Sequence, residues 1–300
     1  MPNQPAQTNA DAARTPVRQE LAETAEVQWW QTKDGLEHPV RIWQATDECA
    51  IVFYFHGIQG HSRWFEDTAL ELNKKGVTVF AADRRGAGSS RALRGHAESW
   101  QQLADDADEI LSRIHATNPN RPIFLVANCW GARLALILAS RPHNSYLKGL
   151  AMTSPAVSML VDVKLVTKFL IGLSLMRGGK HYFEVPLSPE QFTDVPAYVD
   201  YIRRDHTRLT KATAKFFFAS IKLTKACKAV ADGLQLPILI LQAGQDQIVS
   251  VENIKLWFNG LKAQDKTLRV FEKAAHSLDF DPFAAEYQEA LADWILARVK

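Results

Sequence analysis

Cysteine and net charge are both scarce in this sequence of 300 residues. The three cysteines, Cys49, Cys129 and Cys227, are too few for a disulfide framework and lack the spacing of a metal site. A formal net charge of +2 gives no electrostatic basis for nucleic-acid binding. We therefore expect a protein of a reducing compartment that binds no metal ion, no cofactor and no nucleic acid.

Long hydrophobic runs are also missing. The longest, LVTKFLIGLSLM, is interrupted by Lys168 and is too short to span a bilayer. The first residues lack the apolar stretch of a signal peptide, and their polar composition, rich in Pro, Ala and Gln, predicts a disordered tail over residues 1–24. These absences predict a cytoplasmic protein without a transmembrane segment.

An alternation of buried strands and amphipathic helices dominates the rest of the chain. Apolar runs such as AIVFYFHG, VTVFAAD, PIFLVA and PILILQAG alternate with helical patterns. This predicts an α/β fold in which helices cover both faces of a mostly parallel central sheet. The alternation breaks between Ser154 and Leu236. We expect a core formed by residues 25–155 and 236–300 and an inserted helical cap, residues 156–235.

Polar and nucleophilic residues follow the predicted strands. In such sheets, ligands bind beyond the carboxyl ends of the strands. Those ends carry His56-Gly57-Ile58, Cys129, Asp246 and His276. A nucleophile, an acid and a histidine in this chain order are typical of α/β-hydrolases.

Cys129 occupies a predicted strand-to-helix turn, ANCWGA. Small residues, Ala127 and Gly131, flank it where neighbouring backbone crowds such a turn, and the start of the next helix favours a thiolate. His276 would accept and return a proton, and Asp246 would hold the imidazole. Taken singly, these residues could be a buried thiol, a loop histidine and a turn former. Their joint placement favours a catalytic triad.

An acyl-transfer site also needs two backbone N–H donors for the developing oxyanion. We expect them from Trp130, directly after the candidate nucleophile, and from Ile58, in the loop after His56 and Gly57. We further expect the substrate to lie beside His56, Gly57, Asn128 and Trp130.

Six segments resemble the monoacylglycerol lipase and lysophospholipase branch of the α/β-hydrolases, which are serine aminopeptidase S33-like hydrolases. They are FHGIQGHSRWFEDTALELNKKGVTVFAADRRGAGSS, RGHAESWQQLADDADEIL, PIFLVANCWGARLAL, GLAMTSPAV, LPILILQAGQDQIVS and KAAHSLDF. The family usually reads Gly-His-Ser-Met-Gly-Gly at the nucleophile, whereas this chain reads Ala-Asn-Cys-Trp-Gly-Ala at residues 127–132. The resemblance implies a lipase-like enzyme in which Cys129 replaces the nucleophilic serine.

A cysteine changes the chemistry that this resemblance implies. Thiolate is a stronger nucleophile than an alcohol, and its acyl-enzyme is a thioester, open to attack by water or by a second substrate. We expect an enzyme that forms an acyl-cysteine from an acyl ester or thioester and then hydrolyses it or transfers the acyl group. The alternative is a non-catalytic relative that binds a ligand or a partner protein in the same pocket.

The predicted cap carries an excess of positive charge, with twelve Lys or Arg against seven Asp or Glu. This excess indicates either a solvated surface or a docking surface for an anionic partner, such as an acyl carrier protein, coenzyme A or an anionic membrane. Apolar cap residues, including Leu165, Val166, Phe169 and Leu170, are expected to pack on the sheet or to line an acyl pocket.

Overall fold

The computed structural model describes residues 23–299. Residues 1–22 of the predicted tail lie outside the described residues. Within the described part, eight strands form one sheet in the order β1 (Glu26–Gln31), β2 (Glu37–Trp43), β4 (Val77–Ala82), β3 (Ala50–Phe55), β5 (Ile123–Asn128), β6 (Leu147–Thr153), β9 (Ile238–Ala243) and β10 (Lys266–Phe271). From β4 to β10, all neighbouring strands pair in parallel, whereas β2 runs antiparallel to both β1 and β4.

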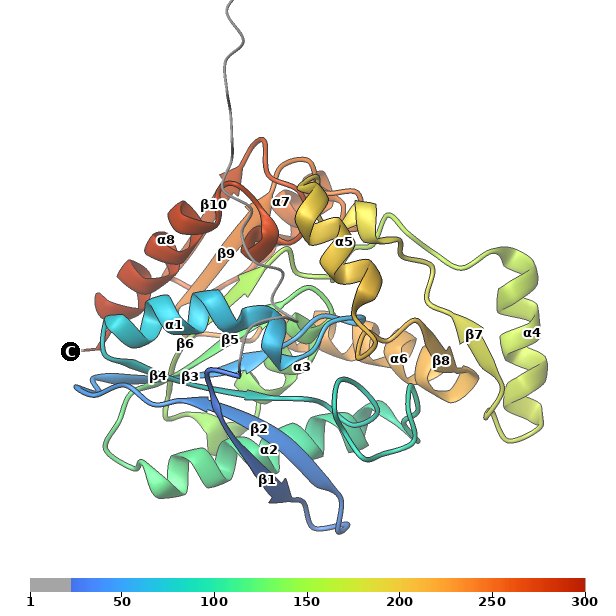
Figure 1. The fold of residues 1–300 in the computed structure, drawn as a ribbon, viewed down its shortest axis with the longest axis horizontal. Helices are drawn as coiled ribbons and strands as arrows, with labels where there is room; N and C mark the ends of the chain where they lie inside the picture. The colour runs from blue at the N-terminus through green and yellow to red at the C-terminus, as the bar shows by residue number, and fades with distance from the viewer. Residues whose placement is uncertain (1–22, 300) are drawn as a thin grey trace, which may run out of the picture.

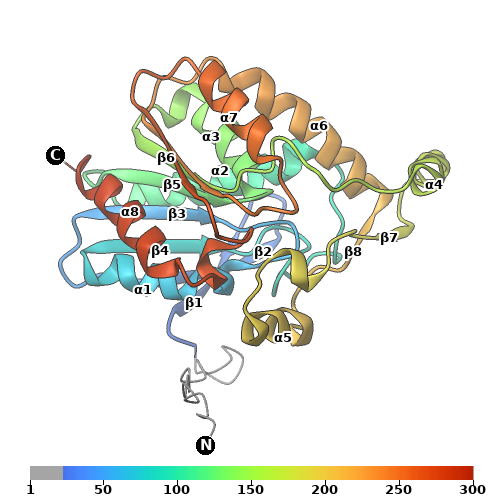
Figure 2. The ribbon, with the colours of Figure 1, turned by 90° about the horizontal axis from the view of Figure 1, so that it is seen from above.

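Helices cover both faces of this sheet (Figures 1 and 2). On one face lie α1 (Glu66–Lys74) and α8 (Ala284–Leu296), and on the other α2 (Trp100–Thr117), α3 (Gly131–Ala139) and α7 (Val251–Gly260). Helix α6 (Ala214–Ala231) packs on α2 and α3 from outside. The central strand β3 shows why both faces need cover. Val52 and Tyr54 join one hydrophobic cluster, while Phe53 and Phe55 join the other. The predicted fold class, an α/β-hydrolase fold, is confirmed.

The strand order creates a crevice at one edge of the sheet. After β3 the chain passes to β4 on one side, and it later returns to β5 on the other side of β3. The loops that leave β3 and β5 therefore diverge, and open sheets bind ligands at such a point. The loop after β3 carries His56, Gly57 and Ile58, and the turn after β5 carries Cys129.

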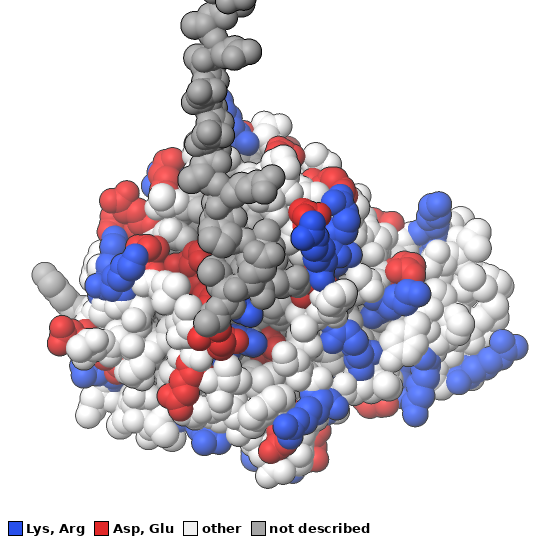
Figure 3. All heavy atoms as spheres, viewed as in Figure 1, with Lys and Arg blue, Asp and Glu red and all other residues white. Residues whose placement is uncertain are grey.

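The segment predicted as the cap contains α4 (Leu165–Met176), α5 (Pro196–Arg204) and α6. It also contains a short antiparallel pair, β7 (Tyr182–Glu184) with β8 (Lys211–Thr213), which the helical periodicity did not predict because each strand has only three residues. Helix α6 lies along α3 of the core, whereas α4 projects from the body (Figure 2). On the face shown in Figure 3, Lys and Arg side chains outnumber acidic ones over the projecting part.

The expected packing of α4 was wrong. Leu165, Val166, Phe169 and Leu170 are exposed by 83, 70, 67 and 45% and neither pack on the sheet nor line the cavity described below. Only Ile171 of this helix is buried. An apolar face of this extent is unusual on a soluble surface and typical of an interaction site.

A buried carboxylate ties the cap to the core. Asp205, after α5, accepts hydrogen bonds from His61 Nε2 and Trp64 Nε1, both at 2.8 Å, and from Thr207. Burial alone would raise the pKa of Asp205, but these bonds outweigh it and hold that pKa below the ordinary 3.8. The ionised carboxylate therefore holds the cap segment against the residues that follow β3.

We expect Asp205→Ala to lower the free energy of unfolding at pH 7 by about 3 kcal/mol, because it removes one partner of a buried ionic network. Since the pKa of Asp205 is lowered, its contribution is present above pH 3.8 and is lost as the pH falls below it. Urea unfolding at several pH values measures this difference.

Asp200→Ala is the matched control, because Asp200 pairs with Arg204 on the exposed face of α5. It should cost under about 1 kcal/mol. Equal losses in the two variants would contradict the proposed role of Asp205 as a tie.

Candidate active site

Cys129 sits in a strained turn between β5 and α3. Its φ is +50°, a left-handed conformation that non-glycine residues seldom adopt. Neighbouring backbone holds the turn in place, since the Cys129 N–H donates to Thr153 O at 2.9 Å and its carbonyl accepts from Ala156 N at 3.0 Å. The side chain is 2% exposed and lines a cavity.

Gly131 makes this turn sterically possible. A Cβ at Gly131 would lie 2.4 Å from Phe55 O and 2.7 Å from His56 O, so no larger residue fits without moving β3. Ala127, on the other side of the turn, is fully buried. The small residues that flank Cys129 therefore have the steric reason that the sequence predicted.

His276 and Asp246 form a buried pair. His276 Nδ1 lies 2.7 Å from Asp246 Oδ2, and both side chains are inaccessible to solvent. Asp246 Oδ1 accepts from the backbone N–H groups of Ile248 and Val249, each at 2.8 Å. Burial raises the pKa of Asp246, but the charge and hydrogen bond of His276 and these N–H groups outweigh it and lower that pKa. Asp246 is thus held as a carboxylate that orients the imidazole.

The other imidazole nitrogen of His276, Nε2, is buried and makes no hydrogen bond of good geometry within residues 23–299. Burial disfavours the charged imidazole, but the charges of Asp246 and of Cys129 outweigh it and raise the pKa of His276 to about 10. The interaction with Cys129 shows that the thiol and the imidazole are close, although their geometry is looser than a formed hydrogen bond. Loose nucleophile–base contacts are common before substrate binds.

The predicted oxyanion donors, Ile58 and Trp130, line the same cavity as Cys129. In the described part of the chain, no hydrogen bond occupies the backbone N–H of either residue. The Trp130 side chain is fixed by a bond from Nε1 to Ser220 Oγ at 2.8 Å and by stacking on Phe216. It forms one wall of the cavity.

His56 supports the loop from behind rather than facing the cavity. Its Nε2 accepts from the backbone N–H of Arg84, so the proton of a neutral ring sits on Nδ1 and is donated to Gly57 O at 2.8 Å. Burial, together with the charge of Arg84, lowers the pKa of His56 to about 3. Arg84 also donates to the carbonyls of Gly57 and Ile58. The two side chains therefore shape the loop that carries Ile58.

Gly57 and Asn128 lie beside the turn but do not line the cavity. A Cβ at Gly57 would approach Asn128 Oδ1 to 3.1 Å, and Asn128 Nδ2 donates to Thr153 Oγ1. Of the four residues predicted beside the substrate, Trp130 alone therefore borders the cavity.

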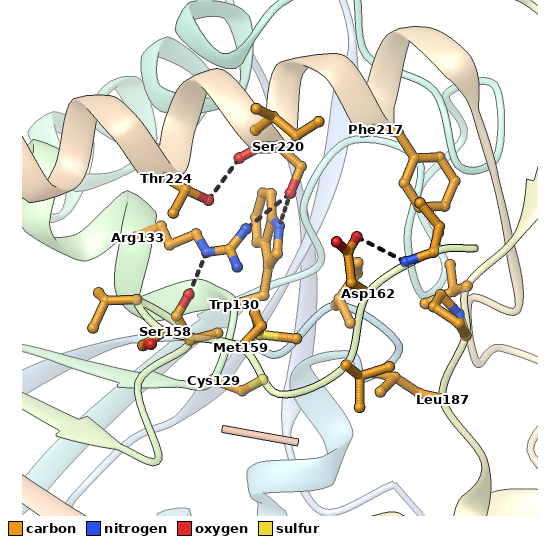
Figure 4. Close-up of a pocket in the computed structure, with 18 of the residues that line it drawn as sticks. Cys129, Trp130, Arg133, Ser158, Met159, Asp162, Leu187, Phe217, Ser220 and Thr224 are labelled. Carbon is orange, nitrogen blue, oxygen red and sulfur yellow. Dashed lines mark hydrogen bonds between the residues drawn. The ribbon is translucent and has the colours of Figure 1, made fainter. Parts of the chain in front are cut away.

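The cavity has a volume of about 570 Å³. Its walls are mostly apolar, and residues 156–163, α4, the 185–187 loop and α6 contribute to them (Figure 4). Arg133, Ser220 and Lys228 also line it, and sequence reasoning missed them. The available signal was one charge, Arg133, in the otherwise apolar helix GARLALILA.

Neither metal nor membrane-spanning features occur in the described part of the chain. No group of three or more His, Cys, Asp or Glu side chains there could hold a metal ion. No helix among these residues is long and apolar enough to cross a bilayer.

A mostly parallel sheet with a strained turn after β5, followed by an acid and a histidine at later strand ends, defines an α/β-hydrolase. The sequence pattern of the family described as "Serine aminopeptidase, S33" matches residues 46–282. The chain belongs to this family.

Named relatives lie in the predicted branch. The chain is 23% identical to "Phospholipase YtpA" of Bacillus subtilis (strain 168) over 80% of this chain and 92% of the relative. It is 27% identical to "Monoglyceride lipase" of Homo sapiens over 82% and 81% of the two chains. Solved monoacylglycerol lipases of Paleococcus ferrophilus (TM-score 0.77, 22% identity, 88% of this chain and 99% of that one) and Saccharomyces cerevisiae (0.83, 15%, 93% and 96%) share the fold.

We expect His276 to remain protonated through neutral pH, because its pKa is raised to about 10. The stabilisation from the His276–Asp246 pair is then complete below the ordinary pKa of 6.5 and is lost as the pH rises through about 10. NMR titration of the imidazole measures the shift, and Asp246→Asn should move the titration to lower pH. A wild-type midpoint near 6.5 would contradict this geometry.

Proposed function

We propose that this protein is an acyl hydrolase or acyltransferase in which Cys129 is the nucleophile. The observation that carries the proposal is a strained cysteine at a cavity, next to a buried His276–Asp246 pair that interacts with it. Strain of this kind persists only where the surrounding structure enforces it, and it clusters at functional sites.

In the first step, Cys129 acts as a thiolate beside the protonated His276, and its sulfur attacks the carbonyl carbon of an acyl ester or thioester. A C–S bond forms, and the negative charge that develops on oxygen is stabilised by the N–H groups of Ile58 and Trp130. The protonated His276 gives its Nε2 proton to the leaving oxygen or sulfur, and the bond to the leaving group breaks. The products are a released alcohol or thiol, an acyl-Cys129 thioester and a neutral His276.

In the second step, neutral His276 accepts a proton from water or from another acceptor, whose oxygen, nitrogen or sulfur attacks the thioester carbon. The C–S bond breaks, and the pair returns to thiolate and imidazolium. Acylation removes the charge of Cys129, one of the two charges that raise the pKa of His276. The imidazole of the acyl-enzyme is therefore a better-matched base for this step than that of the free enzyme.

Relatives named phospholipase and monoglyceride lipase favour lipid esters as the substrate class. The mostly apolar cavity beside Cys129 suits an acyl chain. A non-catalytic relative that keeps the same pocket for a ligand is the alternative that the next experiment excludes or establishes.

Incubation with a medium-chain acyl thioester should add one acyl mass to the protein, because a thioester intermediate is covalent. Cys129→Ala should abolish the adduct, whereas Cys227→Ala, a control at another buried thiol, should retain it. His276→Gln should slow acylation by about a hundredfold or more, as expected for loss of a general acid–base. Intact-protein mass spectrometry follows all four proteins.

The variant Cys129→Ser then helps to distinguish a catalytic site from a non-catalytic one. Gain of ordinary esterase activity would show that the remaining groups support a serine nucleophile. Absence of both an adduct and a released acid or transfer product in the wild type, with esters and thioesters alike, would establish the non-catalytic alternative.

The exposed face of α4 supports substrate uptake from a lipid surface. Leu165 and Phe169 stand free on the projecting helix, and basic residues surround it (Figure 3). Several cap cations are already paired with acidic side chains, among them Lys168 with Asp162, Arg203 with Glu190 and Lys211 with Glu184. We therefore expect apolar contact to contribute more than charge to docking of the cap. This favours a lipid surface over an acyl carrier protein or coenzyme A as the partner.

We expect the double variant Leu165→Ser, Phe169→Ser to bind vesicles with anionic lipid about tenfold or more weakly, because two apolar side chains lose their burial in lipid. Co-sedimentation measures binding. Leu256→Ser, at a 61% exposed position of α7, is the matched control and should bind like the wild type. Equal binding by all three proteins would remove α4 from the uptake surface.

A further inference from the structure

Arg133 is a buried cation without an acidic partner. It lies four residues after Cys129 on α3, is 5% exposed and lines the cavity. No Asp or Glu forms an ion pair with it among residues 23–299. Burial lowers its pKa, although the nearby thiols Cys227 and Cys129 oppose this effect. A buried charge without a partner is costly, so a retained one needs a counter-charge or a strong local reason.

Part of the hydrogen-bonding capacity of Arg133 is unused. Nε donates to Ala156 O at 2.7 Å and Nη1 to Ser220 Oγ at 2.9 Å, which accounts for two of the five N–H groups of a guanidinium. In Figure 4 the guanidinium lies between Ser220 and the loop that carries Ser158, and its third nitrogen joins no marked bond.

Ser220 adds a second donor at the same place. Its Oγ accepts from both Arg133 Nη1 and Trp130 Nε1, which occupies both lone pairs of the hydroxyl oxygen. The hydroxyl proton is therefore left for an acceptor, and no acceptor for it occurs among the described residues, while Ser220 lines the cavity. Arg133 and Ser220 together offer N–H and O–H donors and no acceptor, which is the chemistry of an anion site.

The charges of the side chains that line the cavity also favour an anionic ligand. The wall contains three cations, Arg133, Lys168 and Lys228, and one carboxylate, Asp162. Lys168 forms an ion pair with that carboxylate. The remaining cations are Arg133, deep beside Trp130, and Lys228, which is exposed on α6. The wall therefore carries a net positive charge among otherwise apolar side chains.

We infer that Arg133 and Ser220 bind a carboxylate carried by the acyl group, so that the substrates are half-esters or half-thioesters of dicarboxylic acids. The inference rests on the proposed acyl-Cys129 intermediate and names its substrate class. Arg133 lies in the first turn of α3, four residues after Cys129, and both side chains line the same cavity, which favours a short diacid. A guanidinium matches a carboxylate through parallel N–H bonds.

The test compares two thioesters that differ by one charge. They are the N-acetylcysteamine thioester of hexanedioic acid and that of its monomethyl ester. The corresponding butanedioyl and octanedioyl pairs test other chain lengths. We expect the free carboxylate to raise kcat/KM about tenfold or more for the chain length that fits, as for a charge-assisted hydrogen bond. Arg133→Gln should bring the ratio near one, and Arg133→Lys should keep part of it.

Arg177→Gln is the matched control, because Arg177 is an exposed arginine after α4 and does not line the cavity. It should leave the ratio as in the wild type. A wild-type ratio of one at every chain length, or a ratio unchanged in Arg133→Gln, would overturn the inference and leave Arg133 as a structural link between α3 and α6.

A third thioester, hexanoyl-phosphopantetheine, places the anion on the leaving group instead. If Arg133→Gln weakens turnover of this compound and leaves the hexanedioyl ratio unchanged, the site binds phosphate and the carboxylate assignment is wrong.

A binding measurement tests the anion site independently of the proposed function. Cys129→Ala, which cannot form the thioester, is titrated calorimetrically with monomethyl hexanedioate and with dimethyl hexanedioate. Tighter binding of the monoanion, lost in Cys129→Ala with Arg133→Gln, would support the anion site even if no thioester were turned over. Absence of this preference, together with normal acylation of Cys129, would overturn the anion site and leave the proposed function standing.

Discussion

The backbone turn at Cys129 is the constraint on which the rest of the site depends. A left-handed residue directly after a buried strand is costly, and it survives here because hydrogen bonds from β6 and the missing Cβ of Gly131 leave it no alternative. The turn brings the thiol to the cavity, starts α3 behind it and leaves the Trp130 N–H unoccupied. One conformational constraint thereby sets the position of the nucleophile, of one oxyanion donor and of Arg133 one turn later.

The buried carboxylates of the site and the loops around it are satisfied within the protein, whereas several donors beside Cys129 are not. Asp246, Asp205 and Asp83 are each surrounded by donors from the protein, and Ser62 and Ser89 bind Asp83 to close the DRRGAGSS loop. Among residues 23–299, His276 Nε2, Ser220 Oγ–H and the outer donors of Arg133 lack such partners. These donors lie at the cavity or next to Cys129, which is the pattern expected when substrate completes a site.

Features that depend on local interactions could be predicted from the sequence, and features that depend on contacts between distant segments could not. The strands and core helices were predictable because their apolar periodicity is local, and Cys129, Asp246 and His276 were predictable because strand ends in parallel sheets converge. The exposed face of α4 was not, since an apolar helix in sequence reads as a packed one whatever it faces. His56 was expected beside the substrate, but its ring is engaged by Arg84 and Gly57, a contact between loops that no spacing reveals.

The sequence by itself determined the α/β fold, the order of the candidate triad and the small residues around Cys129, because each is written in periodicity, chain order or side-chain size. Only the tertiary structure decided which polar groups face the cavity. Arg133 is one charge in an apolar helix. In the structure, Ala156 and Ser220, 23 and 87 residues away, accept two of its hydrogen bonds, and no carboxylate of the described part of the chain accepts the others. Which side chains are buried and which partners they bind depend on packing between distant segments. The sequence pattern alone does not contain this information.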